Sequence, residues 1–241
     1  MKNILLVAIL LAVATSAHAQ TTSVIRNWDE AGFSVSGLAQ GRIGNAAQNP
    51  ASNFTYEANI ENAQFQPTAQ ADFNWQNNVA TDWTLTYNAG SGLLNYNVGG
   101  TNGVNLQSAM DTANRDFSDI YIRVFRGDFA GSSTGISDLV YNGVALSPGG
   151  VTQNTYSGIG DAIRIADISP AQGFTLSGKS TFKWDAAAPA TARPKNSQLA
   201  YQVKLGRQAP GNQIPEAGSL CLLLPTLAPV ALLVRRRFSR G

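Results

Sequence analysis

Apolar and polar residues alternate repeatedly along the middle of the chain, and Gly, Asn and Ser separate the alternating stretches. In the segment 83–87, Trp, Leu and Tyr fall on one face of an extended chain and two threonines fall on the other. The turn-forming segment 89–92 follows, and after it the apolar residues of 94–98 alternate with asparagines. This pattern, together with the turn residues between its halves, predicts a β-hairpin.

The segment 120–125 is apolar at almost every position, which is typical of a central strand that is covered on both faces. Alternation predicts further strands, some of them short, at 33–37, 54–60, 73–75, 139–144, 162–166, 174–176, 182–184 and 198–205. Only 106–115 has helical spacing, because Leu106, Met110 and Ala113 fall near one helix face. Many short strands with almost no helix predict an all-β fold, a β-sandwich of jelly-roll type.

The N-terminal segment 1–19 has the features of a secretory signal peptide. Lys2 supplies the positive start, and an apolar run from Ile4 to Val13 follows it. The small residues Ala17 and Ala19 then form a cleavage pattern. We therefore expect the chain to be exported and cleaved, with Gln20 as the mature N-terminus.

The C-terminal segment 214–241 has three parts in a fixed order: a short Pro-Glu motif, an apolar run and a basic end. The apolar run, 218–234, is roughly 25 Å long as a helix at 1.5 Å per residue, which is near the lower limit for crossing a membrane. Pro225 and Pro229 would kink such a helix. The basic end contains Arg235, Arg236, Arg237 and Arg240. These arginines predict that the end stays in the cytoplasm while the rest lies outside.

This segment resembles the PEP-CTERM sorting signal of Gram-negative bacteria. The resemblance covers 214–241 and rests on Pro215 and Glu216, on Gly218 and Ser219 that follow, and on the apolar run and arginine cluster. Ala217 stands where the family usually has a second proline. The resemblance implies that an exosortase, a membrane transpeptidase-like protease, cuts the tethered protein near the motif. A plain tail anchor is the alternative, but it has no need of the Pro-Glu motif.

The middle of the chain, 20–207, is the predicted ectodomain, and 208–213 is a linker rich in Pro, Gly and Gln. The stretches 72–78, 83–87 and 96–100 resemble the β-rich choice-of-anchor surface domains. Those domains are attached to different anchoring signals, and the resemblance implies no catalytic residues. The expected organisation is therefore a β-sandwich between two targeting segments, of which the second carries a single hydrophobic helix.

Composition narrows the chemistry of the ectodomain. The only His, His18, and the only Cys, Cys221, both lie in the terminal segments. A catalytic triad with His, a Cys nucleophile and a Cys/His zinc site are therefore excluded from the ectodomain. Of the 17 basic residues, five lie in the terminal segments, as does one of the 15 acidic residues, which leaves 12 against 14 and a net charge of −2. This balance argues against nucleic acid as a partner.

Three kinds of ligand or substrate remain open. Glycoside hydrolysis requires two converging carboxyl groups, and no paired-carboxylate signature is present. A structural Ca²⁺ ion suits oxygen ligands, but the spacing of the clustered aspartates matches no calcium motif and assigns no ligands. Those aspartates are Asp116, Asp119, Asp128 and Asp138. No other cofactor is expected.

Sugar binding is the third possibility for the ectodomain, because tryptophan rings stack on sugars and amide side chains bond hydroxyl groups. Trp83 and Trp184 share strand faces with apolar residues and are expected in the core, whereas Trp75 precedes a polar Gln-Asn-Asn run and is the candidate for glycan contact. The leading hypothesis is a non-enzymatic surface or matrix protein with a structural or adhesive role linked to exopolysaccharide. A carbohydrate-binding module is the alternative, and a carboxylate-based glycan hydrolase comes after it.

Overall fold

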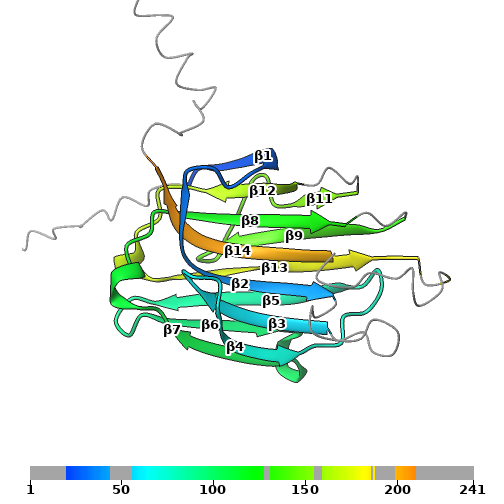
Figure 1. Cartoon of the computed structure of the whole chain (residues 1–241), viewed down its shortest axis with the longest axis horizontal. Coiled ribbons are helices and arrows are strands. Elements are labelled where there is room, and N and C mark those ends of the chain that lie inside the picture. The colour runs from blue at the N-terminus through cyan, green and yellow to red at the C-terminus, as the bar shows by residue number, and fades with distance from the viewer. Residues whose placement is uncertain are drawn as a thin grey trace, which may run out of the picture.

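The computed structural model describes residues 20–43, 56–127, 131–154, 159–185, 187 and 199–209. The strands are β1 (Thr22–Trp28), β2 (Phe33–Ile43), β3 (Tyr56–Asn62), β4 (Pro67–Asp72), β5 (Ala80–Asn88), β6 (Leu93–Val98), β7 (Val104–Ala109), β8 (Asp119–Arg126), β9 (Ser133–Tyr141), β10 (Val144–Ala145), β11 (Val151–Gln153), β12 (Gly160–Ile165), β13 (Phe174–Lys183) and β14 (Leu199–Gln208). Three single 3₁₀ turns accompany them, η1 (Gly100–Asn102), η2 (Thr112–Asn114) and η3 (Pro170–Gln172). The strands run mostly side by side, as Figure 1 shows.

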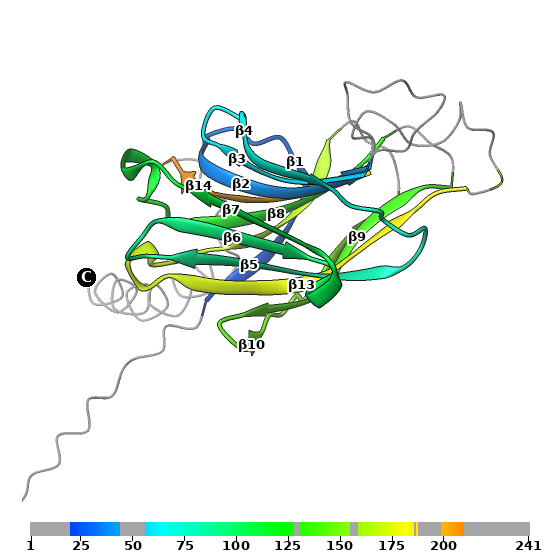
Figure 2. The same cartoon turned by 90° about the horizontal axis from the view of Figure 1, so that it is seen from below.

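The strands form two antiparallel sheets that pack face to face, and the two layers are visible in Figure 2. Sheet A has the order β1-β12-β8-β14-β2-β3-β4. Sheet B has the order β10-β9-β13-β5-β6-β7, and β11 pairs with β9. The predicted all-β class and sandwich architecture are therefore confirmed.

The core lies between the sheets and is built from the inward-facing half of each alternating strand. Leu85 of β5, Tyr96 of β6 and Ile122 of β8 are completely buried there. Tyr96 and Tyr201 meet at the centre of the core through a hydrogen bond between their hydroxyl groups. Burial of both phenols holds their pKa values above the ordinary value, so they remain protonated donors and acceptors at neutral pH.

The predicted hairpin is present as β5 and β6, with Trp83 opposite Val98 and Tyr87 opposite Leu94. Its loop closes with a hydrogen bond from Gly92 N to Asn88 O of 2.7 Å. Gly92 has a φ of 69°, and a Cβ there would collide with the side chain of Arg115. The predicted central strand is also present, because β8 lies between β12 and β14 inside sheet A.

The predicted helix at 106–115 is wrong. Residues 104–109 form strand β7, which pairs with β6 from Val98 opposite Val104 to Leu93 opposite Ala109. Only a 3₁₀ turn at 112–114 follows. The i, i+4, i+7 spacing of Leu106, Met110 and Ala113 imitated a helix face, but pairing with the hairpin satisfies the backbone of 104–109 in extended form.

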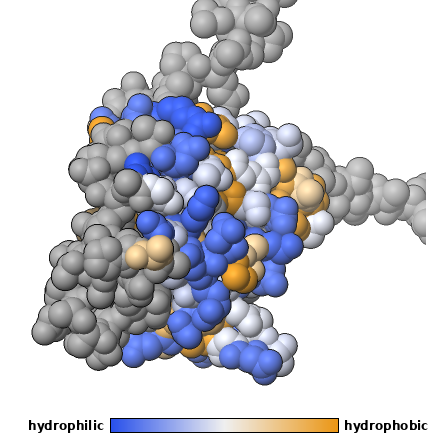
Figure 3. All heavy atoms as spheres, turned by 90° about the vertical axis from the view of Figure 1, so that its right-hand side faces the viewer, coloured by the Kyte–Doolittle hydropathy of each residue, from blue (hydrophilic) through white to orange (hydrophobic). Residues whose placement is uncertain are grey.

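Among the described residues, no helix is both long and apolar enough to cross a membrane. The predicted signal peptide and the predicted span at 218–234 lie outside these residues. Figure 3 shows that the described surface on one side of the sandwich is mostly hydrophilic, with hydrophobic residues in small separate areas.

Candidate functional site

The residues predicted to direct export and sorting lie outside the described part of the chain. They are Ala17, Ala19, Pro215, Glu216, Ala217, Gly218, Ser219, Arg235, Arg236, Arg237 and Arg240. Gln20, the predicted mature N-terminus, is the first described residue and precedes β1. The roles of all these residues stay predictions.

The predicted exposure of Trp75 is wrong, and so is the predicted strand around it. Strand β4 ends at Asp72, and the Trp75 side chain is 2% exposed in the core. Its ring meets Phe182 edge-on at 4.9 Å between centroids. Gly41 of β2 makes room for the indole, because a Cβ there would lie 2.5 Å from Trp75 Cζ2. Trp75 is therefore a packing residue that cannot stack on a glycan.

The polar run after Trp75 serves the fold as well. Asn77 Nδ2 donates to the Trp184 carbonyl at 3.0 Å, and Trp184 N donates to Asn77 Oδ1 at 2.9 Å. Trp83 is in the core as expected, and Trp184 is partly buried against it. Trp28 packs in a second, smaller buried cluster, stacked on Tyr121 at 4.3 Å between ring centroids.

The described members of the aspartate cluster form separate ion pairs. Asp119 accepts from Arg164 Nε at 2.8 Å, and Asp138 lies 3.1 Å from Lys179 Nζ. Asp116 pairs with Arg207, while Asp128 lies outside the described residues. Within the described ranges, no three His, Cys, Asp or Glu side chains gather closely enough to hold a metal ion.

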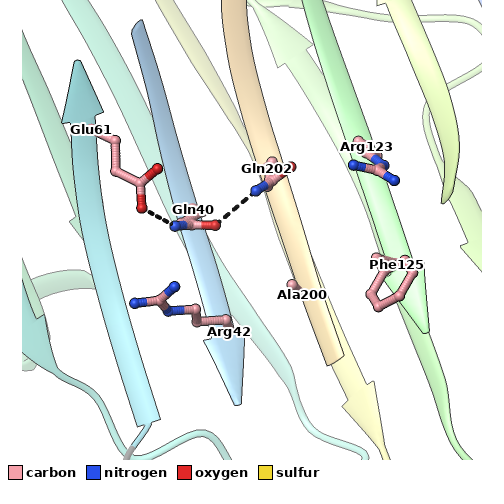
Figure 4. A pocket seen from close by; sticks show the side chains of 7 residues that line it. All are labelled: Gln40, Arg42, Glu61, Arg123, Phe125, Ala200 and Gln202. Carbon is pink, nitrogen blue, oxygen red and sulfur yellow. Dashed lines mark hydrogen bonds between the residues drawn. The ribbon is translucent and has the colours of Figure 1, made fainter. Parts of the chain in front are cut away.

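A polar hollow lies on the outer face of sheet A, the face turned away from sheet B. Its volume is about 440 Å³. Its described lining comes from β2, β3, β8 and β14 and comprises Gln40, Arg42, Glu61, Arg123, Phe125, Ala200 and Gln202 (Figure 4). These seven residues define the outer hollow of sheet A, and sequence reasoning did not identify it.

Strand register explains why the sheet is hollowed there. Ala200 on β14 lies opposite Arg42 on β2 and opposite Phe125 on β8. Its methyl group therefore forms a low floor between two long side chains, about 4.8 Å from each neighbouring strand. Because side chains alternate between sheet faces, the next outward position on β14 is Gln202.

Amide side chains form a continuous hydrogen-bonded row beside this floor. Gln202 Nε2 donates to Gln40 Oε1 at 2.9 Å, and Gln40 Nε2 donates to Glu61 Oε1 at 2.6 Å, as Figure 4 shows. Asn59 Nδ2 donates to the same carboxylate oxygen at 3.0 Å. Each bond restricts the rotamer of the next side chain, so the row is held rigid before any ligand arrives.

Glu30 is the shared counter-ion of two cations beside the outer hollow, and Glu61 is the one carboxylate among its described lining residues. Arg123 Nη1 lies 2.6 Å from Glu30 Oε1, and Lys204 Nζ lies 2.6 Å from Glu30 Oε2. Burial lowers the pKa of the Lys204 ammonium group from its ordinary value, and the hydrogen bond and charge of Glu30 oppose this. Burial likewise lowers the pKa of Arg42, and the charge of Glu61 opposes it.

Two aromatic rings cover the Lys204 ammonium group. The ring of Trp28, at the end of β1, lies 5.8 Å from Lys204 Nζ, and the ring of Phe65, between β3 and β4, lies 5.3 Å from it. Arg123 extends over Gly160, where a Cβ would come within 2.6 Å of its Nε. The cations at this end of the hollow are therefore fixed in place.

The arrangement offers a rigid polar surface with one aromatic side chain. Amide and carboxylate groups of this kind bond hydroxyl groups, and a partly exposed ring such as Phe125 packs on the C–H face of a sugar.

No protein-family model matches this chain, and no curated protein matches its sequence.

Proposed function

We propose that this chain is an exported, non-enzymatic protein of the bacterial cell surface or extracellular matrix, and that its β-sandwich holds polysaccharide. The observation that carries the proposal is the outer hollow of sheet A, where Gln202, Gln40 and Glu61 form a preorganised row. Rigid polar groups bind a flexible sugar chain with less loss of entropy than mobile ones. The sandwich in this proposal is of jelly-roll type, which is supported by the way β12, β13 and β14 alternate between the sheets.

The terminal segments support the export part of the proposal. A signal peptide at 1–19 starts translocation, and the apolar run at 218–234 with its arginines stops it. The protein is then held in the membrane with Pro215 and Glu216 on the outer side. An exosortase cuts near this motif and passes the sandwich to the envelope or to an exopolysaccharide matrix.

Mass spectrometry of the mature protein from its host tests the processing step. We expect an N-terminus at Gln20 and a C-terminus close to Pro215 and Glu216. A mature envelope form that still contains 220–241 would contradict processing, and a plain membrane anchor would then replace it.

Retention on immobilised polysaccharide from the host tests the binding step. We expect the full chain, purified in detergent, to be retained and to elute with soluble polysaccharide of the same kind. Passage through the column without delay would contradict the proposed polysaccharide binding while leaving the export pathway in place.

A further inference from the structure

We infer that β7, at the edge of sheet B, pairs with β7 of a second copy of this chain, so that sheet B continues from one copy into the other. This inference concerns assembly and is independent of the proposed polysaccharide binding. It follows from three properties of β7: an unprotected edge, backbone groups that point away from the sheet, and a residue pattern that matches itself in antiparallel pairing.

Three of the four strands that end the two sheets carry features that prevent pairing with another strand. Natural edge strands are protected by charge, proline, irregular register or short length. On sheet A, β1 contains Arg26 and a register shift against β12, while β4 begins with Pro67 and has a register shift against β3. On sheet B, β10 is two residues long. These three edges are therefore poor templates for a partner strand.

Strand β7 has none of these protective features. Residues 104–109 include no charged residue and no proline, and they pair with β6 in an unbroken register. In the described part of the chain, β7 pairs with no other strand. Asn105, Gln107 and Ala109 are exposed, so this edge is open to solvent. It lies beside β4 on one side of the sandwich (Figure 1).

The register shows which backbone groups of β7 remain available to a partner. Met110 N donates to Gly92 O at 2.9 Å, and this pair lies next to Leu93 opposite Ala109. Hydrogen-bonded and non-hydrogen-bonded pairs alternate in an antiparallel ladder. The N–H and C=O groups of residues 104, 106 and 108 therefore bond to β6, and those of residues 105, 107 and 109 point away from the sheet.

A second copy of β7 fits this edge because the strand matches itself. Antiparallel pairing about a twofold axis at Gln107 places Gln107 opposite Gln107 of the other copy, and Asn105 opposite Ala109. Each of these pairs exchanges both N–H···O bonds, so every outward-pointing backbone group finds a partner. The paired strands bring no like charges together, and Leu106 lies opposite Ser108 on the inner face. A charged partner strand would find no counter-charge on β7.

Sedimentation equilibrium of the full chain in detergent tests the assembly. Because this short edge buries less area than a permanent interface, we expect a monomer–dimer equilibrium that depends on concentration. Gln107→Pro removes the central N–H donor from both copies and should weaken the dimer about tenfold or more. Proline is tolerated on an edge strand where the missing N–H would face solvent. A chain that stays monomeric throughout, or a dimer that Gln107→Pro does not weaken, would overturn the inference.

Charge at the axis gives a second test that leaves the backbone unchanged. Gln107→Lys and Gln107→Glu each place like charges opposite each other, so each variant should dimerise less than the unmodified chain. An equimolar mixture of the two should restore dimers, because opposite charges then meet across the axis. A mixture that dimerises no better than either variant alone would contradict the axis at Gln107.

Disulfide formation separates the β7 edge from contacts made elsewhere in the chain. Gln107→Cys in a Cys221→Ser background should cross-link under mild oxidation, because paired Cα atoms lie about 5.5 Å apart. Thr175→Cys in the same background is the control and should stay monomeric. Thr175 is exposed on the same outer face, in the row that reaches Gln107 through Thr86 and Asn95. Equal cross-linking of the two variants would overturn the assignment to β7.

Discussion

The two outer faces of the sandwich are both polar, yet their side chains have different partners. On sheet A, Gln40, Asn59 and Lys204 are only 3%, 0% and 2% exposed, and they bond to carboxylates within the protein. On sheet B, the row Asn97, Thr84 and Ser177 is partly exposed, and its members face solvent from paired strands. The first face is a built polar network, and the second is an ordinary solvated surface.

The difference comes from what each face is packed against. Trp28 at the end of β1 and Phe65 between β3 and β4 bring aromatic rings onto Lys204, and Glu30 enters beside them. Once water is excluded, polar groups must bond to each other, because an unpartnered buried polar group is costly. Alternation in the sequence thus identifies a polar face, but only the covering segments decide whether that face becomes a site.

The largest effect is expected from a residue that belongs to neither outer face. Trp75→Ala should lower the free energy of unfolding by about 3–5 kcal/mol, because it leaves a cavity in the packed core. Trp75→Phe keeps most of the ring contacts and should cost less. Denaturant unfolding measures both. A Trp75→Ala protein that is fully stable but has lost sugar binding would show that Trp75 is a ligand contact after all.

A smaller effect is expected from charge removal, and it should differ between the faces. Glu30→Gln takes the counter-ion from Lys204, whose side chain is 3% exposed, and should cost about 2 kcal/mol. Asp138→Asn makes the same chemical change in the exposed pair with Lys179 on sheet B, and we expect no measurable loss. Urea unfolding of the two variants compares them directly. Equal losses would show that the two faces do not differ in this way.

Alkaline pH probes one buried phenol on each sheet. Burial raises the pKa of Tyr121 on β8 and of Tyr141 on β9 to about 12, above the ordinary value of about 10. Between these values the folded chain holds more protons than the unfolded chain. The stability contributed by each phenol is therefore complete below about pH 10 and is lost as pH rises toward about 12.

Removal of either phenol hydroxyl should reduce the loss of folding stability at alkaline pH. Tyr121→Phe and Tyr141→Phe are each expected to weaken the fall in stability by no more than about 1.4 kcal/mol per pH unit. Unfolding measured from about pH 9 upward gives the slopes. Tyr121→Phe also loses the hydrogen bond to Gln208 Oε1 at 3.1 Å, so its stability at neutral pH should be the lower of the two. If stability falls with pH as steeply in the variants as in the unmodified chain, the raised pKa values of these two phenols would be contradicted.

The parts of the fold that local patterns determine could be predicted from the sequence. Strands β5, β6 and β8 alternate or run apolar in the way that strands do, and the 89–92 turn joins the first two. Strand β7 was missed because its conformation depends on pairing with β6 rather than on its own spacing. Trp75 was placed on the surface because its burial depends on Gly41, which is distant in the chain and lies below the ring.

The outer hollow could not be predicted for a related reason. Its lining comes from four strands, and Gln40 and Gln202 are brought together only because β14 pairs with β2. The one local signal is in 198–205, where Ala200 interrupts the otherwise polar set of outward positions. A small residue among large ones marks a depression in a sheet, but the sequence does not say which strands flank it.

One measurement tests the role of the outer hollow most directly: retention on host polysaccharide of two variants that each introduce a phenylalanine. Ala200→Phe fills the floor of the hollow on sheet A, and Ser177→Phe places the same ring on the outer face of sheet B. We expect Ala200→Phe to lose retention and Ser177→Phe to keep it, with both proteins folded. Retention of Ala200→Phe at the level of the unmodified chain would contradict the assignment of polysaccharide binding to the outer hollow of sheet A.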